Sequence, residues 1–185
     1  MNIQNCVEQV PGLLRHGIAA ITLSTMSILP CVAGTLYESN YPLTDERGQT
    51  VHLSDFRGQK AVVAMEYSAC HFMCSITFAR LKELQAVAEM HRIDAAIIVI
   101  SLDPANDTPA QWRAYRKMRG ISGNRWHLLT PRLEDMPNIA RALGVHYWYD
   151  GEHLLHDFRV LRLGASGEIL AAMTNFDADP LNFLK

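Results

Sequence analysis

Two uninterrupted apolar segments constrain the fold of this chain most strongly. They are AVVAMEY at residues 61–67 and AAIIVISL at residues 95–102. Such runs are typical of strands that are buried on both faces of a sheet, which is the usual setting of parallel strands. Between them, from about Met73 to His91, apolar residues recur at helical spacing. The sequence therefore predicts two parallel strands joined by a crossover helix.

The flanking segments extend this unit into a mixed sheet. Residues 107–120 carry the signals of a helix, with Asp107 or Thr108 as its cap and Pro109 in the first turn. The other expected elements are a hairpin within 41–59, a short strand at 126–130, a helix at 134–144 and a closing hairpin of 158–163 with 168–173. YDGEHLL, just before the closing hairpin, is interpreted as irregular. The order predicts an α/β fold, a thioredoxin-like mixed sheet flanked by helices with an amino-terminal β-hairpin addition.

The first 33 residues have the features of a targeting segment. Gly17–Leu29 contains no charge, a basic flank precedes it, and small residues lead to Ala33. These features predict a signal peptide cleaved after Ala33, or an uncleaved membrane anchor. A lipid-anchored Cys31 and a first core helix are the remaining alternatives. The folded domain is expected from residue 39 to residue 185, in most of these cases outside the cytoplasm.

Size and composition exclude several classes of protein. A chain of 185 residues with 49% hydrophobic residues suits one globular domain with a full core. A net charge of −2 gives no electrostatic basis for binding nucleic acid. Four cysteines are too few for a disulfide-stapled scaffold. The cysteines must therefore be interpreted by position.

The segment SACHFMCS, residues 68–75, holds the most reactive residues of the chain. Cys70 and Cys74 lie four residues apart, where the first buried strand runs into the first long helix. A spacing of four places both sulfurs on one face of a helical turn, which allows either a disulfide or a shared metal ion. The amino terminus of a helix also stabilises thiolates. A redox pair, a metal site and two idle buried thiols all stay open from this motif alone.

A metal site needs at least one more ligand. Two thiolates with an imidazole favour Cu(I), or zinc if a fourth ligand is present. His156 directly precedes the closing hairpin, in the loop that lies next to the redox motif of a thioredoxin-like sheet, and His153 is the second candidate. His71 and Met73, between the cysteines, are further donors close to the site.

Taken together, these motifs resemble the Sco/SenC family. The resemblance rests on CxxxC after a buried strand, on SLDPANDTP at 101–109, on the late histidine and on the opening LTDERGQTV…DFRG, and it runs from about Tyr41 to Met173. Members are thioredoxin-like copper chaperones for the dinuclear copper centre of cytochrome c oxidase. The resemblance implies copper bound by Cys70, Cys74 and His156, with Asp103 near the metal. The chain departs from the family pattern at three places, where it has His71, Ser75 and Asp157.

The expected function is that of an exported metallochaperone that carries one copper ion per domain. It would deliver copper to a respiratory oxidase copper centre or maintain the thiols of that centre. Its partners would be a copper-receiving oxidase subunit or another copper chaperone. The expected location is periplasmic or otherwise extracytoplasmic, with membrane attachment through the N-terminal segment if that segment is retained. The alternatives are a thiol–disulfide oxidoreductase and a copper or redox sensor. The CxxxC spacing, in place of CxxC, weighs against the enzyme.

Overall fold

The computed structural model describes residues 35–69 and 74–185, apart from the side chains of Cys74 and Ser75. The predicted targeting segment at 1–33 therefore lies outside the described residues. So do three of the expected site residues, Cys70, His71 and Met73.

Three parallel strands form the centre of a seven-stranded sheet with the order β2-β1-β5-β4-β3-β8-β9. They are β3 (Lys60–Glu66), β4 (Ala95–Ser101) and β5 (Trp126–Pro131). All seven residues of β4 and six of the seven of β3 are buried. The prediction of parallel strands covered on both faces is therefore confirmed.

Antiparallel strands complete both edges of the sheet. The amino-terminal hairpin of β1 (Leu43–Asp45) and β2 (Thr50–Val51) pairs through β1 with β5. At the other edge, β8 (Val160–Leu163) pairs with β3, and β9 (Ile169–Met173) pairs with β8. The sheet is thus mixed, as expected. The first hairpin is shorter than its predicted segment because the chain turns into a 3-10 helix, η3 (Leu53–Phe56).

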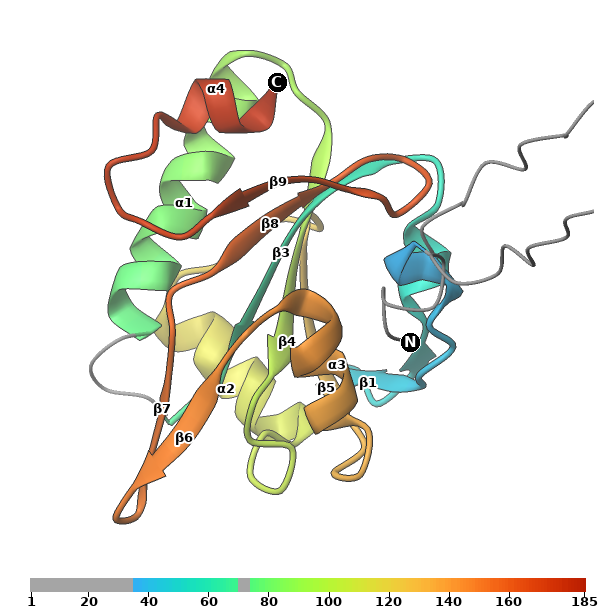
Figure 1. Cartoon of the computed structure of the whole chain (residues 1–185), viewed down its shortest axis with the longest axis vertical. Helices are drawn as coiled ribbons and strands as arrows, with labels where there is room; N and C mark the ends of the chain where they lie inside the picture. Colours follow the sequence, from blue (N-terminus) through green and yellow to red (C-terminus); the bar gives the residue numbers. More distant parts are fainter. Residues whose placement is uncertain (1–34, 70–73) are drawn as a thin grey trace, which may run out of the picture. The chain divides into compact units, whose positions relative to one another are not determined.

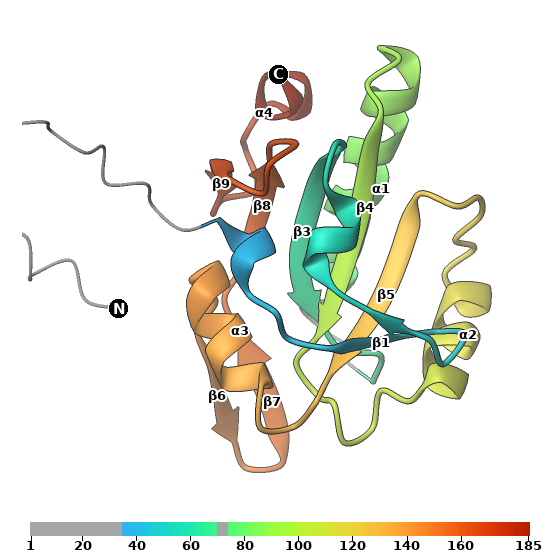
Figure 2. The same ribbon diagram turned by 90° about the vertical axis from the view of Figure 1, so that its right-hand side faces the viewer.

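Helices cover the two faces of the sheet separately, as Figures 1 and 2 show. On one face lie α1 (Cys74–Met90), α2 (Pro109–Met118) and a short α4 (Pro180–Leu184), over a core that includes Trp112 and Trp126. On the opposite face, η3 packs in one apolar cluster together with η2 (Leu36–Glu38) and α3 (Met136–Leu143). Helix α4 follows the last predicted element and was not expected from the sequence.

Helix α2 begins where its signals predicted. The Thr108 side chain accepts a hydrogen bond from the backbone N–H of Gln111 at 3.3 Å, and Pro109 is the first helical residue. Thr108 is therefore the N-cap, which leaves the carboxylate of Asp107 for other contacts. Trp112 anchors the helix: it is fully buried, and its indole N–H donates to Thr130 Oγ1 at 2.8 Å.

A second, two-stranded sheet stands apart from the main one. It is a hairpin of β6 (Tyr147–Asp150) and β7 (His153–His156), which projects from the lower left of the domain in Figure 1. The interpretation of YDGEHLL as irregular is wrong, because this segment forms the end of β6, the turn and most of β7. Gly151 adopts a φ of 61° in the turn, a left-handed conformation that glycine accepts without strain.

The described chain enters the domain beside the β8–β9 turn. The backbone N–H of Leu36 donates to the carbonyl of Gly167 at 3.0 Å. Close by, the N–H of Gly58 donates to the carbonyl of Ala165 at 2.9 Å, just before β3 begins. Among the described residues, no helix combines the length and apolar character needed to cross a bilayer.

Candidate metal centre

The candidate site lies at the carboxyl ends of the parallel strands. Tyr67 and Ser68 continue from the end of β3 toward Cys70, and α1 begins at Cys74. Open α/β sheets place their sites at this edge. Cys74 is thus the first residue of a helix, as the sequence predicts for the second cysteine of the motif.

The structure places His156 beside the chain that leads into the cysteine motif. His156 is 4% exposed and ends β7. Its ring meets that of Tyr67 edge-to-face, with 6.4 Å between the ring centroids. The hydroxyl of Tyr67 also donates to the carbonyl of Leu154 at 2.6 Å. Tyr67 thus joins the end of β3 to β7, three residues before Cys70.

The hydrogen bond of the His156 ring selects its tautomer. Nδ1 lies 2.9 Å from the carbonyl oxygen of Asp157. Because a carbonyl only accepts, Nδ1 carries the proton of the neutral ring and Nε2 carries the lone pair. A backbone carbonyl orients metal-binding histidines in this way in many proteins. The imidazole of His156 therefore has the tautomer that coordination through Nε2 requires.

His153, the second candidate, lies toward the tip of the same hairpin. It is exposed and pairs with Asp150 next to the turn, whereas His156 pairs with Tyr147 at the base. Three residues of strand separate the two histidines by about 10 Å at a rise of about 3.3 Å per residue. The two histidines thus occupy different environments.

Asp103 lies in the turn after β4. Both carboxylate oxygens of Asp103 accept hydrogen bonds from the side-chain amide of Asn106, at 3.0 and 2.9 Å. The backbone N–H of Asp103 donates to the hydroxyl of Ser101 at 2.9 Å. In the described part of the chain, Asp103 is therefore bound within its own turn.

Asp107 is the acidic residue that contacts the chain leading to the cysteines. Asp107 is fully buried, and its Oδ1 accepts a hydrogen bond from the backbone N–H of Ser68 at 3.0 Å. Burial raises the pKa of Asp107 above its ordinary value of 3.8, although hydrogen bonds from Ser101 and Ser68 lower it in part. The sequence alone indicates only a helix-capping role for Asp107. A contact across 39 residues leaves no local pattern that could have revealed it.

A clamp of backbone and side-chain contacts closes the base of the β6–β7 hairpin. The backbone N–H of Asp157 donates to the carbonyl of His146 at 3.0 Å, and the N–H of His146 donates to Asp157 Oδ1 at 3.1 Å. Oδ2 of the same carboxylate lies 3.1 Å from Nδ1 of the His146 ring. Asp157, one of the departures from the family pattern, directly follows His156 and thus ties the end of β7 to His146.

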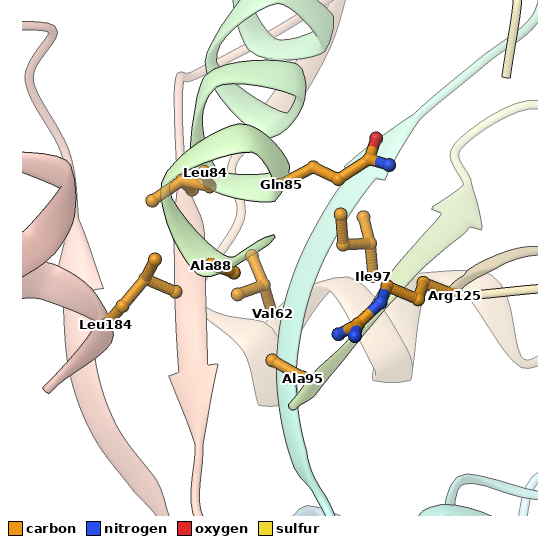
Figure 3. Close-up of a pocket in the computed structure, with 8 residues that line it drawn as sticks. All are labelled: Val62, Leu84, Gln85, Ala88, Ala95, Ile97, Arg125 and Leu184. Atoms are coloured by element: carbon orange, nitrogen blue, oxygen red, sulfur yellow. The ribbon is translucent and has the colours of Figure 1, made fainter. Parts of the chain in front are cut away.

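No complete metal site can be assembled from the described residues. Among them, no group of three or more His, Cys, Asp or Glu side chains could hold a metal ion. The pocket in Figure 3 is apolar, runs under α1 and is lined by residues such as Leu84, Ala88 and Leu184. Its volume is about 10 Å³, roughly the space of one water molecule. The expected ligand Cys70 lies outside the described residues.

Comparison with protein families identifies the chain. The family model SCO1/SenC matches residues 33–179. The chain belongs to the SCO1/SenC family. The resemblance drawn from the CxxxC, SLDPANDTP and late-histidine motifs is thereby confirmed.

Sequence and structure comparisons agree with this assignment. The chain is 24% identical over 136 residues to an SCO2-like protein of Rickettsia felis, and the match covers 66% of each chain, just under two thirds. The fold resembles that of Arabidopsis thaliana ScoI with copper bound, with a TM-score of 0.68, 18% identity and coverage of 78% of this chain and 90% of the other. It also resembles BsSco, described as having a disulfide switch, with a TM-score of 0.68, 20% identity and coverage of 80% and 88%. The predicted thioredoxin-like fold of this SCO1/SenC protein is confirmed.

Proposed function

We propose that this SCO1/SenC protein is a metallochaperone that binds one copper ion through Cys70, Cys74 and His156. Two thiolates supply the soft donors that Cu(I) prefers, and the imidazole adds a donor that Cu(II) accepts well. Copper is the cargo of the protein, so the site must release the ion as well as bind it. Support comes from the family and from relatives such as ScoI of Arabidopsis thaliana, whose structure holds copper.

One observation carries the choice of ligands. The Tyr67 ring lies against the His156 ring, and Tyr67 is three residues from Cys70. The segment from Tyr67 to Cys70 spans about 10 Å when extended and less when turned. A linking segment of this length is compatible with Cys70 and His156 sharing one metal ion. His153 lies about 10 Å further along β7, so it is less well placed than His156 to share a metal ion with Cys70.

The first experiment measures copper in the reduced protein under anaerobic conditions. We expect one copper ion per chain, and we expect acidification to release it because thiolate ligands must be deprotonated to bind. A stoichiometry near zero would contradict the metallochaperone function. Preferential binding of zinc would indicate a structural site with a fourth ligand instead.

Histidine variants test the ligand set. His156→Ala should weaken copper binding by at least about tenfold and change the Cu(II) spectrum, while copper still binds through the two thiolates. His153→Ala is the matched control on the same strand and should behave like the unchanged protein. If His153→Ala loses the Cu(II) signal and His156→Ala keeps it, the ligand assignment is wrong.

A thiol–disulfide function is the second candidate. The relative BsSco is described as having a disulfide switch and as a member of a family of cytochrome c oxidase assembly proteins. In this chain a reversible disulfide between Cys70 and Cys74 would exclude copper, because oxidised sulfurs are no longer thiolates. Thiol counting before and after mild oxidation tests the pairing. Dimerisation with both thiols retained would contradict it.

The partner and location follow from the same proposal. The copper would pass to an oxidase subunit or to another copper chaperone outside the cytoplasm. A relative from Bacillus anthracis is described as a SCO1/SenC family lipoprotein, which supports an extracytoplasmic location. Residues 1–33 would serve as a signal peptide or as a retained anchor. Sequencing the amino terminus of the protein recovered from the cell envelope tests the cleavage.

A further inference from the structure

Asp107 joins the ends of three neighbouring parallel strands. Its Oδ1 accepts from the backbone N–H of Ser68, directly after β3, at 3.0 Å. Its Oδ2 accepts from the hydroxyl of Ser101, the last residue of β4, at 2.6 Å. Its backbone carbonyl accepts from the hydroxyl of Thr130 in β5, also at 2.6 Å. One buried residue thus ties together the edge of the sheet at which the candidate site lies.

Of the three hydrogen bonds of Asp107, the one from Ser68 is made by a residue that no strand holds in position. Ser101 and Thr130 already have fixed positions, because each lies within a strand of the sheet. Ser68 lies beyond the end of β3, two residues before Cys70, where strand pairing no longer holds the chain. A hydrogen bond to an ionised carboxylate is stronger than one to a neutral acceptor. The position of the Ser68 amide therefore depends on Asp107.

Tyr67, the residue directly before Ser68, is also held in place by contacts of its side chain. Its ring packs in the apolar cluster on the α3 face, and its hydroxyl binds the carbonyl of Leu154 in β7. Tyr67 thus connects the chain to the strand that ends in His156, while Ser68 is connected to Asp107. Tyr67 and Ser68 are therefore both held by contacts with other parts of the domain, three and two residues before Cys70.

We propose that Asp107 is a positioning residue of the copper site: its carboxylate fixes the Ser68 amide and so sets where the chain enters Cys70 relative to His156. This inference rests on the proposed copper function. Asp103, four residues earlier, does not make this contact: among the described residues its carboxylate accepts from the side-chain amide of Asn106.

The test compares copper binding by the whole reduced protein and its variants. Asp107→Ala removes the acceptor for the Ser68 amide, and we expect a loss of Cu(I) affinity of at least about tenfold and an altered Cu(II) spectrum. Asp107→Asn keeps an oxygen acceptor for that amide, so most of the affinity and the original spectrum should return. Asp94→Ala is the acidic control, because Asp94 lies just before the start of β4, is exposed and pairs with Arg125; it should stay within about twofold of the unchanged protein.

A purely structural role would give a different result. In that case Asp107→Ala would unfold at a lower urea concentration, while its folded fraction would bind copper with unchanged affinity and spectrum. That outcome would overturn the inference, as would an equal loss in the control Asp94→Ala. If Asp107→Ala does not fold, Ser101→Ala decides, because it removes the bond that holds Oδ2. We expect a fall of a few-fold in affinity, and no change would refute the positioning role.

The outcome separates this inference from the proposed function. If the unchanged protein binds no copper, the function itself fails and the positioning role fails with it. If the unchanged protein binds one copper ion and Asp107→Ala binds equally well, only the positioning role fails. Hydrogen exchange at the Ser68 amide provides a readout without copper. We expect the amide to be protected in the unchanged protein and in Asp94→Ala, and exposed in Asp107→Ala.

Discussion

Replacing Tyr67 by phenylalanine removes one hydroxyl and keeps the aromatic ring. The lost contact is the 2.6 Å hydrogen bond to the carbonyl of Leu154, while the packing of the ring against His156 remains. A hydrogen bond of this kind contributes about 0.5–1.5 kcal/mol net, since water replaces the partner when the protein unfolds. We therefore expect Tyr67→Phe to lower the free energy of unfolding by about 1 kcal/mol.

Urea unfolding of the reduced protein measures this change. With a denaturant slope of about 2 kcal/mol per molar, the midpoint should fall by about 0.5 M. Opening of the β6–β7 hairpin, followed by hydrogen exchange, should become roughly fivefold more frequent, which is the same energy expressed as an equilibrium constant. Tyr149→Phe is the matched control, because Tyr149 lies on the same hairpin and is 65% exposed. If both variants keep the original midpoint, the bond from Tyr67 does not secure the hairpin.

Two further predictions concern stability. Gly167→Ala should destabilise the protein at least about 1 kcal/mol more than Gly151→Ala: both glycines have positive φ, but only at Gly167 would a Cβ collide, with the Tyr37 side chain. Equal urea midpoints for the two variants would contradict this. The pKa of His127 is lowered from 6.5, mainly by burial and further by Arg116 and Arg47. Since the folded state resists protonation of His127, stability is fully present above pH 6.5 and is lost as the pH falls below it. The urea midpoint of the unchanged protein should fall between pH 7 and about pH 5.5, and His127→Gln should show a smaller fall. If both proteins lose the same amount, His127 is not the cause.

The central strands could be predicted from the sequence because their environment is uniform. Both faces of β3 and β4 are covered, so nearly every residue is apolar, and the observed ends lie within one residue of the predicted ones. Helix α2 was predicted for a different reason: a threonine cap and a proline in the first turn are local signals. For β3, β4 and α2, the local sequence was sufficient for a correct prediction.

Two features near the candidate site were missed, for different reasons. The β6–β7 hairpin contains an Asp150–Gly151 turn, a common hairpin signal, but its strands are short and one of them is mostly exposed, so little alternation remains. The tie from Asp107 to Ser68 joins residues 39 positions apart and has no local signature. For the site, the sequence named His156 and His153, and only the fold distinguishes their surroundings.

If the protein is the proposed metallochaperone, the route by which the chain enters the domain limits where copper would be offered. The backbone N–H of Leu36 donates to Gly167 in the β8–β9 turn, whereas Tyr67 follows the end of β3 and packs against His156 of β7. In Figure 1 the β8–β9 turn and the β6–β7 hairpin lie at opposite ends of β3. Seven residues of strand correspond to about 23 Å. A domain held at its amino terminus would therefore carry its ligands on the pole far from the point of attachment. A membrane-bound recipient would have to present its own copper ligands at a comparable height above the bilayer, or the domain would have to tip over on its linker to reach them.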